Sequence, residues 1–105
     1  LAVELFELVD GNIVFNEIAP RPHNSFHWTI DGCDNSQFDI LVRTICGLNV
    51  KDVSSNGKWE MTNIIGEDVN NLINVYNNQN YLLNLYGKKN TKPGRKMGHY
   101  NKKII

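Results

Sequence analysis

The stretch AVELFELVDGNIVFNEIA, residues 2–19, decides the fold of the first part of the chain. Two runs rich in apolar and β-branched residues flank a central Asp10-Gly11, and this dipeptide favours a tight two-residue hairpin turn. The sequence therefore predicts an antiparallel hairpin. The cross-strand pairs that such a turn predicts are Phe6 with Phe15, Leu5 with Asn16, and Glu4 with Glu17.

The predicted hairpin places two carboxylates, Glu4 and Glu17, opposite each other. Directly opposed residues have Cβ atoms about 4.5–5.5 Å apart, and like charges at that separation destabilise a sheet. A cation would remove this cost, and oxygen ligands of this kind suit Mg²⁺. Two other interpretations stay open: a bulge could shift the register, or both acids could lie on a solvated edge.

The segment NEIAPRPHNSFHW, residues 16–28, concentrates polar groups with neither a helical nor a strand period. Pro20 and Pro22 hold the backbone extended on either side of Arg21. Arg21 offers a planar fork of donors for carboxylate or phosphate, and His23 can accept or deliver a proton near neutral pH. We expect a rigid substrate loop directly after the second carboxylate. Neutral hydrogen-bonding groups follow at Asn24 and Ser25.

The remaining sequence predicts one helix, a second short helix and three strands. The segment 34–47 is typical of a helix. Asp34 is its predicted N-cap, Gln37 completes a predicted capping box, and Gly47 is its predicted end. Its predicted apolar face consists of Phe38, Leu41, Val42 and Ile45. The other predicted elements are a strand over 58–66, a short helix over 67–77, and strands over 81–87 and 95–104. The expected class is α+β with mostly antiparallel strands.

Charge is distributed unevenly in a chain whose formal net charge is zero. Residues 86–105 contain seven of the eleven basic residues and none of the eleven acids, so this end favours an anionic partner. Cys33 and Cys46 lack a metal-ligand pattern, and no apolar run is long enough for a membrane span. We therefore expect a cytoplasmic protein without a membrane or nucleic-acid partner. Because the chain opens without Met, we also expect a fragment of a longer protein.

Several motifs carry a resemblance to a known family: the hairpin with its NEIAPRPHNS loop, SQFDILVRTICGL, and YGKKNTKPGRKMGHY. Together they resemble the C-terminal portion of the N5-carboxyaminoimidazole ribonucleotide synthetases, the ATPase subunits of phosphoribosylaminoimidazole carboxylase. These are ATP-grasp ligases of de novo purine synthesis. The family uses ATP and bicarbonate to carboxylate 5-aminoimidazole ribonucleotide through carboxyphosphate.

The resemblance implies roles for individual residues. Glu4 and Glu17 would hold Mg²⁺ on the ATP phosphates, with Asn16 and Glu17 in the nucleotide site. Arg21 and His23 would act on carboxyphosphate and the imidazole amine. The implied substrate-binding residues are Asn24, Ser25, Lys88, Arg95 and Lys96. The resemblance further implies that residues 1–47 end an ATP-grasp domain, that 48–105 form a small β-rich domain, and that the full-length enzyme is a homodimer. We expect this segment alone to be inactive.

One departure and two alternatives accompany the resemblance. Phe26 stands where the family pattern HNSGH has glycine, which could disturb the loop. A non-catalytic module could bind an anion or nucleic acid through residues 88–103, but only Tyr86 and Tyr100 offer the aromatic faces that a nucleic-acid reader needs. Another ATP-grasp ligase, such as a component of a biotin-dependent carboxylase, would share Glu4 and Glu17 but would not predict PGRKMGH.

Overall fold

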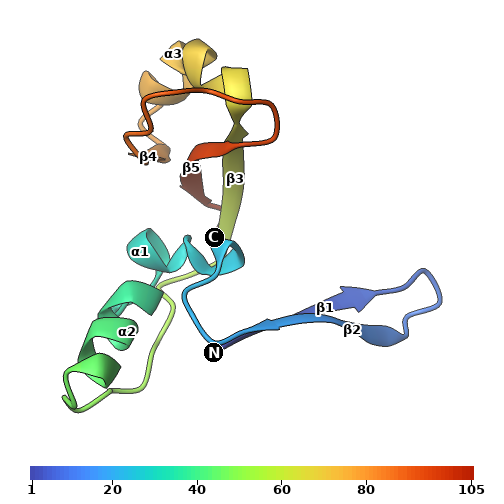
Figure 1. Cartoon of the computed structure of the whole chain (residues 1–105), viewed down its shortest axis with the longest axis vertical. Coiled ribbons are helices and arrows are strands. Elements are labelled where there is room, and N and C mark those ends of the chain that lie inside the picture. The colour runs from blue at the N-terminus through green and yellow to red at the C-terminus, as the bar shows by residue number, and fades with distance from the viewer.

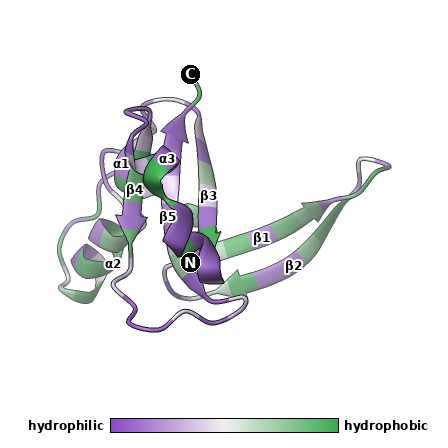
Figure 2. Ribbon diagram, turned by 90° about the horizontal axis from the view of Figure 1, so that it is seen from above, coloured by the Kyte–Doolittle hydropathy of each residue, from purple (hydrophilic) through white to green (hydrophobic).

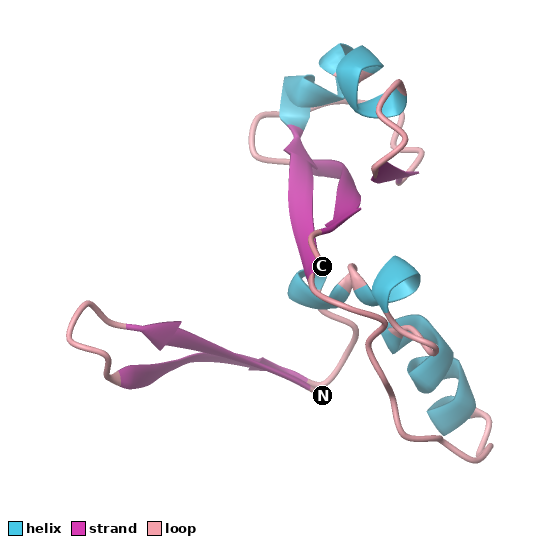
Figure 3. Cartoon of the chain, turned by 180° about the vertical axis from the view of Figure 1, so that it is seen from behind, coloured by secondary structure: helices cyan, strands magenta, loops and turns pink.

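A computed structural model describes residues 1–105, and it confirms an α+β chain with antiparallel strands. One sheet is the two-stranded hairpin β1-β2, and the other is three-stranded in the order β3-β5-β4 (Figure 1). Figure 3 shows from behind that the short helices lie between and beside these sheets. None of the helices has both the length and the apolar character needed to cross a bilayer.

The hairpin consists of β1 (Ala2–Glu7) and β2 (Ile13–Ala19) and confirms the first prediction, although its turn differs. Leu8 O accepts a hydrogen bond from Gly11 N–H at 2.9 Å, and Leu8 N–H donates to Asn12 O at 2.8 Å. Three residues therefore form the loop, and Gly11 takes the left-handed φ of +84° that ends such a turn. The predicted two-residue turn was wrong by one residue.

A β-bulge at Asn16 offsets the longer loop. Near the turn, Leu5 pairs with Phe15 and Phe6 with Val14, so the predicted pairs Phe6–Phe15 and Leu5–Asn16 were wrong. The register then shifts between Glu4 and Leu5, leaving Asn16 without a partner. As a result, Glu4 lies opposite Glu17, as the sequence predicted.

The hairpin extends from the rest of the chain as an arm with little packing of its own (Figures 1 and 2). Only Ala2 and Ala19, at its base, are buried. Large apolar side chains on both strands remain exposed: Val3, Leu5, Phe6, Ile13, Val14, Phe15 and Ile18. The fold of this arm therefore rests on its backbone ladder and on contacts at its base.

The loop after the hairpin is more regular than predicted and leads into the main helix. It contains a 3-10 turn, η1 (Asn24–Phe26), and one turn of helix, α1 (Thr29–Gly32), before α2 (Gln37–Ile45).

Ser36, not Asp34, caps helix α2. The Ser36 hydroxyl accepts from Asp39 N–H, and the Asp39 carboxylate accepts from Ser36 N–H, which forms the capping box. The predicted cap was wrong because the Asp34 carboxylate instead accepts hydrogen bonds from Ser54 N–H at 3.0 Å and the Ser54 hydroxyl at 3.1 Å. Gly47, with φ of +64°, ends the helix region as predicted.

The predicted apolar face of α2 does not form a buried seam within this chain. Phe38, Val42 and Ile45 are 39%, 57% and 73% exposed, and Leu41 is half-buried. Packing within residues 1–105 therefore does not account for the apolar period of this helix.

The second sheet contains β3 (Trp59–Ile65), β4 (Tyr81–Leu85) and the central β5 (Lys96–Lys103). The predicted helix over 67–77 is instead a 3-10 helix, η2 (Gly66–Asn71), followed by α3 (Ile73–Tyr76). Asparagine has low helix propensity, and Asn70 and Asn71 end η2 just before the junction at Leu72. The buried core of this sheet consists of Ile64, Met97, His99 and Asn101.

Polar contacts and a ring stack join the first part of the chain to this sheet. Asn101 Nδ2 donates to Asp31 Oδ2 at 2.6 Å, and Cys33 forms an isolated β-bridge with Ser55. The rings of His27 and His99 stack with centroids 5.1 Å apart. The loop after the hairpin and the basic C-terminal end are thereby held against each other.

Candidate metal and substrate site

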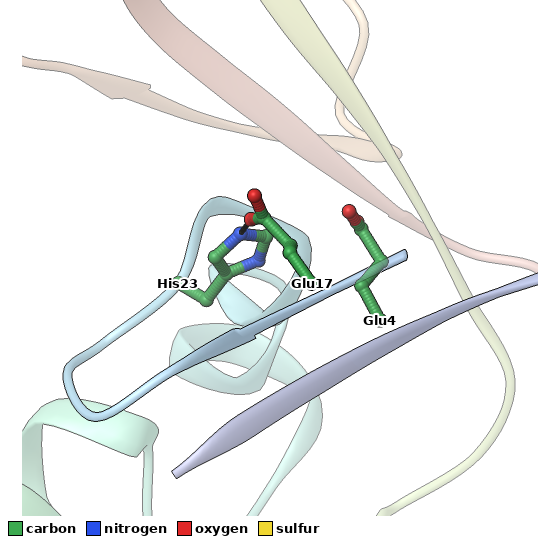
Figure 4. Close-up of side chains that lie close together, drawn as sticks. All are labelled: Glu4, Glu17 and His23. Atoms are coloured by element: carbon green, nitrogen blue, oxygen red, sulfur yellow. Dashed lines mark hydrogen bonds and ion pairs between the residues drawn. The ribbon is translucent and has the colours of Figure 1, made fainter. Parts of the chain in front are cut away.

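The hairpin and the following loop bring Glu4, Glu17 and His23 together, as Figure 4 shows. Each residue contributes one potential ligand atom, and these atoms lie within 4.8 Å of one another. The bulge at Asn16 sets the register of the two carboxylates, and the chain reversal after Ala19 returns His23 to the same side. The side chain of Glu17 is 51% exposed and that of His23 is 11% exposed, so the group opens to solvent beside a buried ring.

Hydrogen bonds fix the orientation of the His23 ring. His23 Nε2 lies 2.5 Å from Glu17 Oε1, and Nδ1 lies 2.6 Å from the Ser25 hydroxyl oxygen. A carboxylate only accepts, so Nε2 carries the hydrogen that faces Glu17. The ring can therefore accept from the Ser25 hydroxyl at Nδ1.

The second carboxylate has its own neutral partners. Asn16 Nδ2 donates to Glu4 Oε2 at 2.8 Å, so the residue that forms the bulge also orients one member of the carboxylate pair. The Ser25 hydroxyl lies 3.4 Å from Glu4 Oε1. The structure thus brings five of the predicted site residues into one cluster: Glu4, Asn16, Glu17, His23 and Ser25.

No lysine or arginine neutralises the carboxylate pair. The His23–Glu17 contact is the chain's one ion pair within 4.0 Å, and it is ionic only when the imidazole is protonated. Two opposed carboxylates with further oxygen donors beside them match the hard, oxygen-rich ligand sets that hold Mg²⁺. The donor chemistry of the cluster therefore fits a divalent cation.

Arg21 and Asn24 lie on the same loop but outside this hydrogen-bonded cluster. Arg21 is exposed, and its guanidinium donates to the backbone oxygen of Pro22 at 3.0 Å. The Asn24 side chain makes no hydrogen bond within the chain, whereas its backbone oxygen accepts from His27 N–H. Both side chains are free to contact a bound molecule.

The predicted phosphate ligands surround the start of β5. Lys88 Nζ donates to Lys96 O at 2.5 Å, and Arg95 Nη1 donates to Asn90 O at 2.9 Å. Lys88 and Lys96 are exposed, and Arg95 is half-buried. None of the three forms an ion pair, so their charges remain available to an anion.

A second group of rings, which the sequence prediction left out of the site, lies between the loop and β5. His27 is stacked between Phe38 and His99, with centroid separations of 5.6 and 5.1 Å. Burial lowers the pKa of His27, and the positive charge of Lys96 lowers it further. The charge of Lys96, at the start of β5, therefore acts on His27 in the loop after the hairpin.

His99 supports this arrangement from inside the sheet. Its ring is 1% exposed, and Nδ1 lies 2.7 Å from the hydroxyl of Tyr86. Burial lowers the pKa of His99, as does neighbouring His27. Tyr86 is thus half-buried and bonded inward, and the ring of Tyr100 is tilted by 47° against that of Tyr81, with centroids 5.0 Å apart. Neither tyrosine is fully exposed, whereas the nucleic-acid alternative requires an open aromatic face.

Gln37 has a different role from the one that its position in the sequence predicted. Its side chain does not belong to the capping box but bonds the backbone of His23 and the ring of His27. A glutamine freed from capping by the adjacent Ser36 and Asp39 is the one signal that could have indicated this role.

Phe26 is accommodated without backbone strain. No residue other than glycine has a positive φ, so the position does not require the glycine of the family pattern. The Phe26 ring lines a cavity of about 510 Å³ between the loop and α2, and its backbone oxygen accepts from the Thr29 hydroxyl at 2.6 Å. The substitution therefore leaves the hydrogen-bonded cluster intact.

Comparison with protein families gives two matches in sequence order. Residues 1–38 match the ATP-grasp domain, and residues 60–102 match the phosphoribosylaminoimidazole carboxylase C-terminal domain. The N5-carboxyaminoimidazole ribonucleotide synthase of Brucella melitensis is 41% identical over 99 residues, covering 94% of this chain and 27% of that protein. The chain matches the C-terminal part of the N5-carboxyaminoimidazole ribonucleotide synthases.

Solved structures of the N5-carboxyaminoimidazole ribonucleotide synthase family agree with this assignment. The Staphylococcus aureus N5-carboxyaminoimidazole synthetase superposes with a TM-score of 0.88 at 38% identity, covering 97% of this chain and 28% of that one. The Aspergillus clavatus enzyme, solved with ADP and 5-aminoimidazole ribonucleotide, gives a TM-score of 0.87 at 38% identity over 97% of this chain and 29% of its own. The chain thus spans between a quarter and a third of these relatives.

Proposed function

We propose that this chain supplies the metal-binding hairpin, substrate loop and phosphate-binding end of an N5-carboxyaminoimidazole ribonucleotide synthase. The reaction converts 5-aminoimidazole ribonucleotide, bicarbonate and ATP to N5-carboxyaminoimidazole ribonucleotide, ADP and phosphate through carboxyphosphate. The proposal rests mainly on the cluster of Glu4, Glu17 and His23, whose ligand atoms lie within 4.8 Å of one another. In this cluster the hairpin supplies two carboxylate ligands and the loop supplies a group that can carry a proton.

Glu4 and Glu17 would hold Mg²⁺. Bound there, the ion would neutralise charge on the ATP phosphates during phosphoryl transfer. Asn16 serves the same end of the site, because its amide fixes the Glu4 carboxylate at 2.8 Å and leaves its own carbonyl oxygen available to the nucleotide.

Arg21 and His23 act on the bicarbonate-derived group. The exposed Arg21 guanidinium has donors left for the oxygens of carboxyphosphate, where a planar fork stabilises negative charge. His23 holds a proton at Nε2 and an acceptor at Nδ1, so it can orient the intermediate or move the proton that the attacking amine loses.

The ribonucleotide binds across the boundary between loop and sheet. Lys88, Arg95 and Lys96 receive its 5′-phosphate, supported by their proximity at the start of β5 and by their lack of ion-pair partners. Asn24 and Ser25 supply hydrogen bonds from the loop side.

Further features of the whole protein follow from the same proposal. We divide the chain into residues 1–47, the end of the ATP-grasp domain, and residues 48–105, a small β-rich domain. Catalysis requires the remainder of a longer protein, in keeping with the 27% coverage of the Brucella relative, so residues 1–105 alone are inactive. We place the enzyme in the cytoplasm, where Cys33 and Cys46 stay free thiols, and expect a homodimer.

The proposal is tested with the full-length protein that carries this chain. Wild-type protein should release ADP from Mg-ATP in a reaction that requires both bicarbonate and 5-aminoimidazole ribonucleotide. Glu17→Gln should lower kcat by about a hundredfold or more, because the neutral amide is a poor ligand for a hard cation. Glu7→Gln on the same hairpin is the matched control and should retain activity. Full activity of Glu17→Gln would refute the metal assignment.

A further inference from the structure

The side-chain amide of Gln37 grips the backbone of His23 from both sides. Gln37 Oε1 accepts from His23 N–H at 2.8 Å, and Gln37 Nε2 donates to His23 C=O at 2.9 Å. The same Nε2 donates to His27 Nδ1 at 2.9 Å. Both amide hydrogens and the amide oxygen are therefore engaged by the two histidines of the substrate loop.

These contacts permit only one orientation of the amide. Exchanging its oxygen and nitrogen would direct NH₂ at the His23 N–H and an oxygen at both the His23 carbonyl and the His27 ring. Since Nε2 is the donor, His27 Nδ1 is the acceptor, and the hydrogen of this neutral ring lies on its own Nε2. The amide thereby determines the tautomer of His27 as well as the position of His23.

The Gln37 side chain is itself held in a fixed position by its neighbours. Gln37 is the first residue of α2, where the Ser36–Asp39 capping box fixes the start of the helix. Gln37 N–H donates to the Thr29 hydroxyl at 3.0 Å, and Thr29 is 7% exposed. The loop around His23, by contrast, has only a three-residue 3-10 turn of its own. The helix therefore provides the rigid reference for the loop.

We propose that Gln37 is a positioning residue, which holds His23 at the distance from Glu17 and Ser25 that the reaction needs. The inference rests on the proposed function. The expected effect arises from misplacement of a reacting group. A displacement of about 1 Å can lower the rate about a hundredfold, and loss of a hydrogen-bonding partner behind a functional residue lowers activity about 10- to 100-fold. Gln37 itself touches no substrate in this scheme.

The test compares three variants in the full-length protein. Gln37→Glu keeps the size of the side chain and the acceptor for His23 N–H but loses both donors. Gln37→Met keeps the approximate volume and loses every hydrogen bond. Gln79→Glu, at an exposed position far along the chain from the loop, is the matched control for the added charge. We expect kcat to fall about 10- to 100-fold in both Gln37 variants and to stay at the wild-type value in Gln79→Glu.

A spectroscopic readout separates positioning from a loss of folded protein. The ¹⁵N shifts of the His27 ring should report an unprotonated Nδ1 in the wild type, and in Gln37→Glu the carboxylate should draw a proton onto that nitrogen. Each rate is divided by the concentration of folded protein, which far-ultraviolet circular dichroism measures independently of activity. If Gln37→Glu unfolds, Gln37→Met provides the kinetic comparison.

The outcomes distinguish this inference from the function beneath it. Wild-type kcat in both Gln37 variants, with an active wild-type enzyme, would overturn the positioning role and leave the proposed function standing. A rate loss that equals the loss of folded protein would also overturn it. A wild-type protein that makes no product would overturn the proposed function and the positioning role together. Slower turnover by fully folded variants, with the changed His27 spectrum, would support both.

Discussion

The hairpin arm and the three-stranded sheet are both antiparallel, yet they differ in what surrounds them. In the arm, Phe15 and Ile18 are 62% and 55% exposed, and burial is confined to Ala2 and Ala19 at the base. In the sheet, central β5 is enclosed by both neighbours, and Ile64 and Met97 are 2% and 3% exposed. The proposed metal ligands thus lie on the region with less core, and the proposed phosphate ligands lie beside the region with more.

This difference in packing shows which contacts hold the proposed site in position. The arm contributes the carboxylates but little packing, so the position of the cluster depends on the loop that returns His23 to Glu17. That loop is held by Gln37 from one side and by the His27–His99 stack from the other. The residues that form the buried core and the proposed metal ligands therefore lie in different parts of the sequence, and these two contacts connect them.

The largest expected effect tests the contrast in packing directly with a matched pair of substitutions in the 105-residue chain. Ile64→Ala removes a buried side chain from the sheet and should lower the free energy of unfolding by about 2–5 kcal/mol. Ile18→Ala makes the same change on the exposed arm and should cost less than about 1 kcal/mol. Denaturant unfolding measures both, and equal losses would contradict the contrast.

The next effect asks whether the two regions serve different substrates in the full-length enzyme. Arg95→Ala should raise KM for the ribonucleotide about 10- to 100-fold, because a charge-assisted hydrogen bond is worth about 1.5–3 kcal/mol. KM for ATP should stay unchanged. Lys89→Ala, which removes a neighbouring exposed charge, is the control. An unaltered KM for the ribonucleotide in Arg95→Ala would argue against the phosphate role.

The smallest effect concerns pH and the stack that joins the regions. The pKa values of His27 and His99 are lowered in the folded chain, chiefly by burial, so the unfolded chain binds protons more readily at these sites. The stability that these two neutral rings contribute should be fully present above the unfolded pKa, near 6.5. It should decrease as the pH falls through that value toward the lowered pKa of the folded state.

The free energy of unfolding should therefore be lower at pH 5 than at pH 7.5 because of these two groups. Thermal unfolding at both pH values measures it. In His99→Gln the same pH change should cost less than in the wild type, whereas an identical pH dependence in the variant would exclude a contribution from His99.

Local patterns in the sequence predicted the elements well and their junctions less well. The alternating apolar runs around Asp10-Gly11 were sufficient for the hairpin, and Glu4 and Glu17 do face each other. That pairing was reached through a two-residue turn, whereas the chain uses a three-residue loop and a bulge. The two irregularities offset each other, and a bulge depends on cross-strand contacts that no local pattern reports.

Long-range partners explain the remaining differences. Asp34 has the composition of a helix cap, but Ser54, twenty residues away, takes its carboxylate. Gln37 has the spacing of a capping-box residue, but the backbone of His23, fourteen residues away, takes its amide. Local rules assign a polar side chain to the nearest unpaired backbone group, whereas the tertiary structure gives each of these two residues a partner distant in the sequence.

The paired irregularities of the hairpin also matter for how this segment can change length. Val9 in the loop and Asn16 in the bulge each have no partner across the ladder. Removal of either residue by an in-frame deletion would leave Glu4 facing Glu17, although loss of Asn16 would also remove the amide bonded to Glu4. The hairpin therefore has two positions at which the loss of one residue would keep the two carboxylates together.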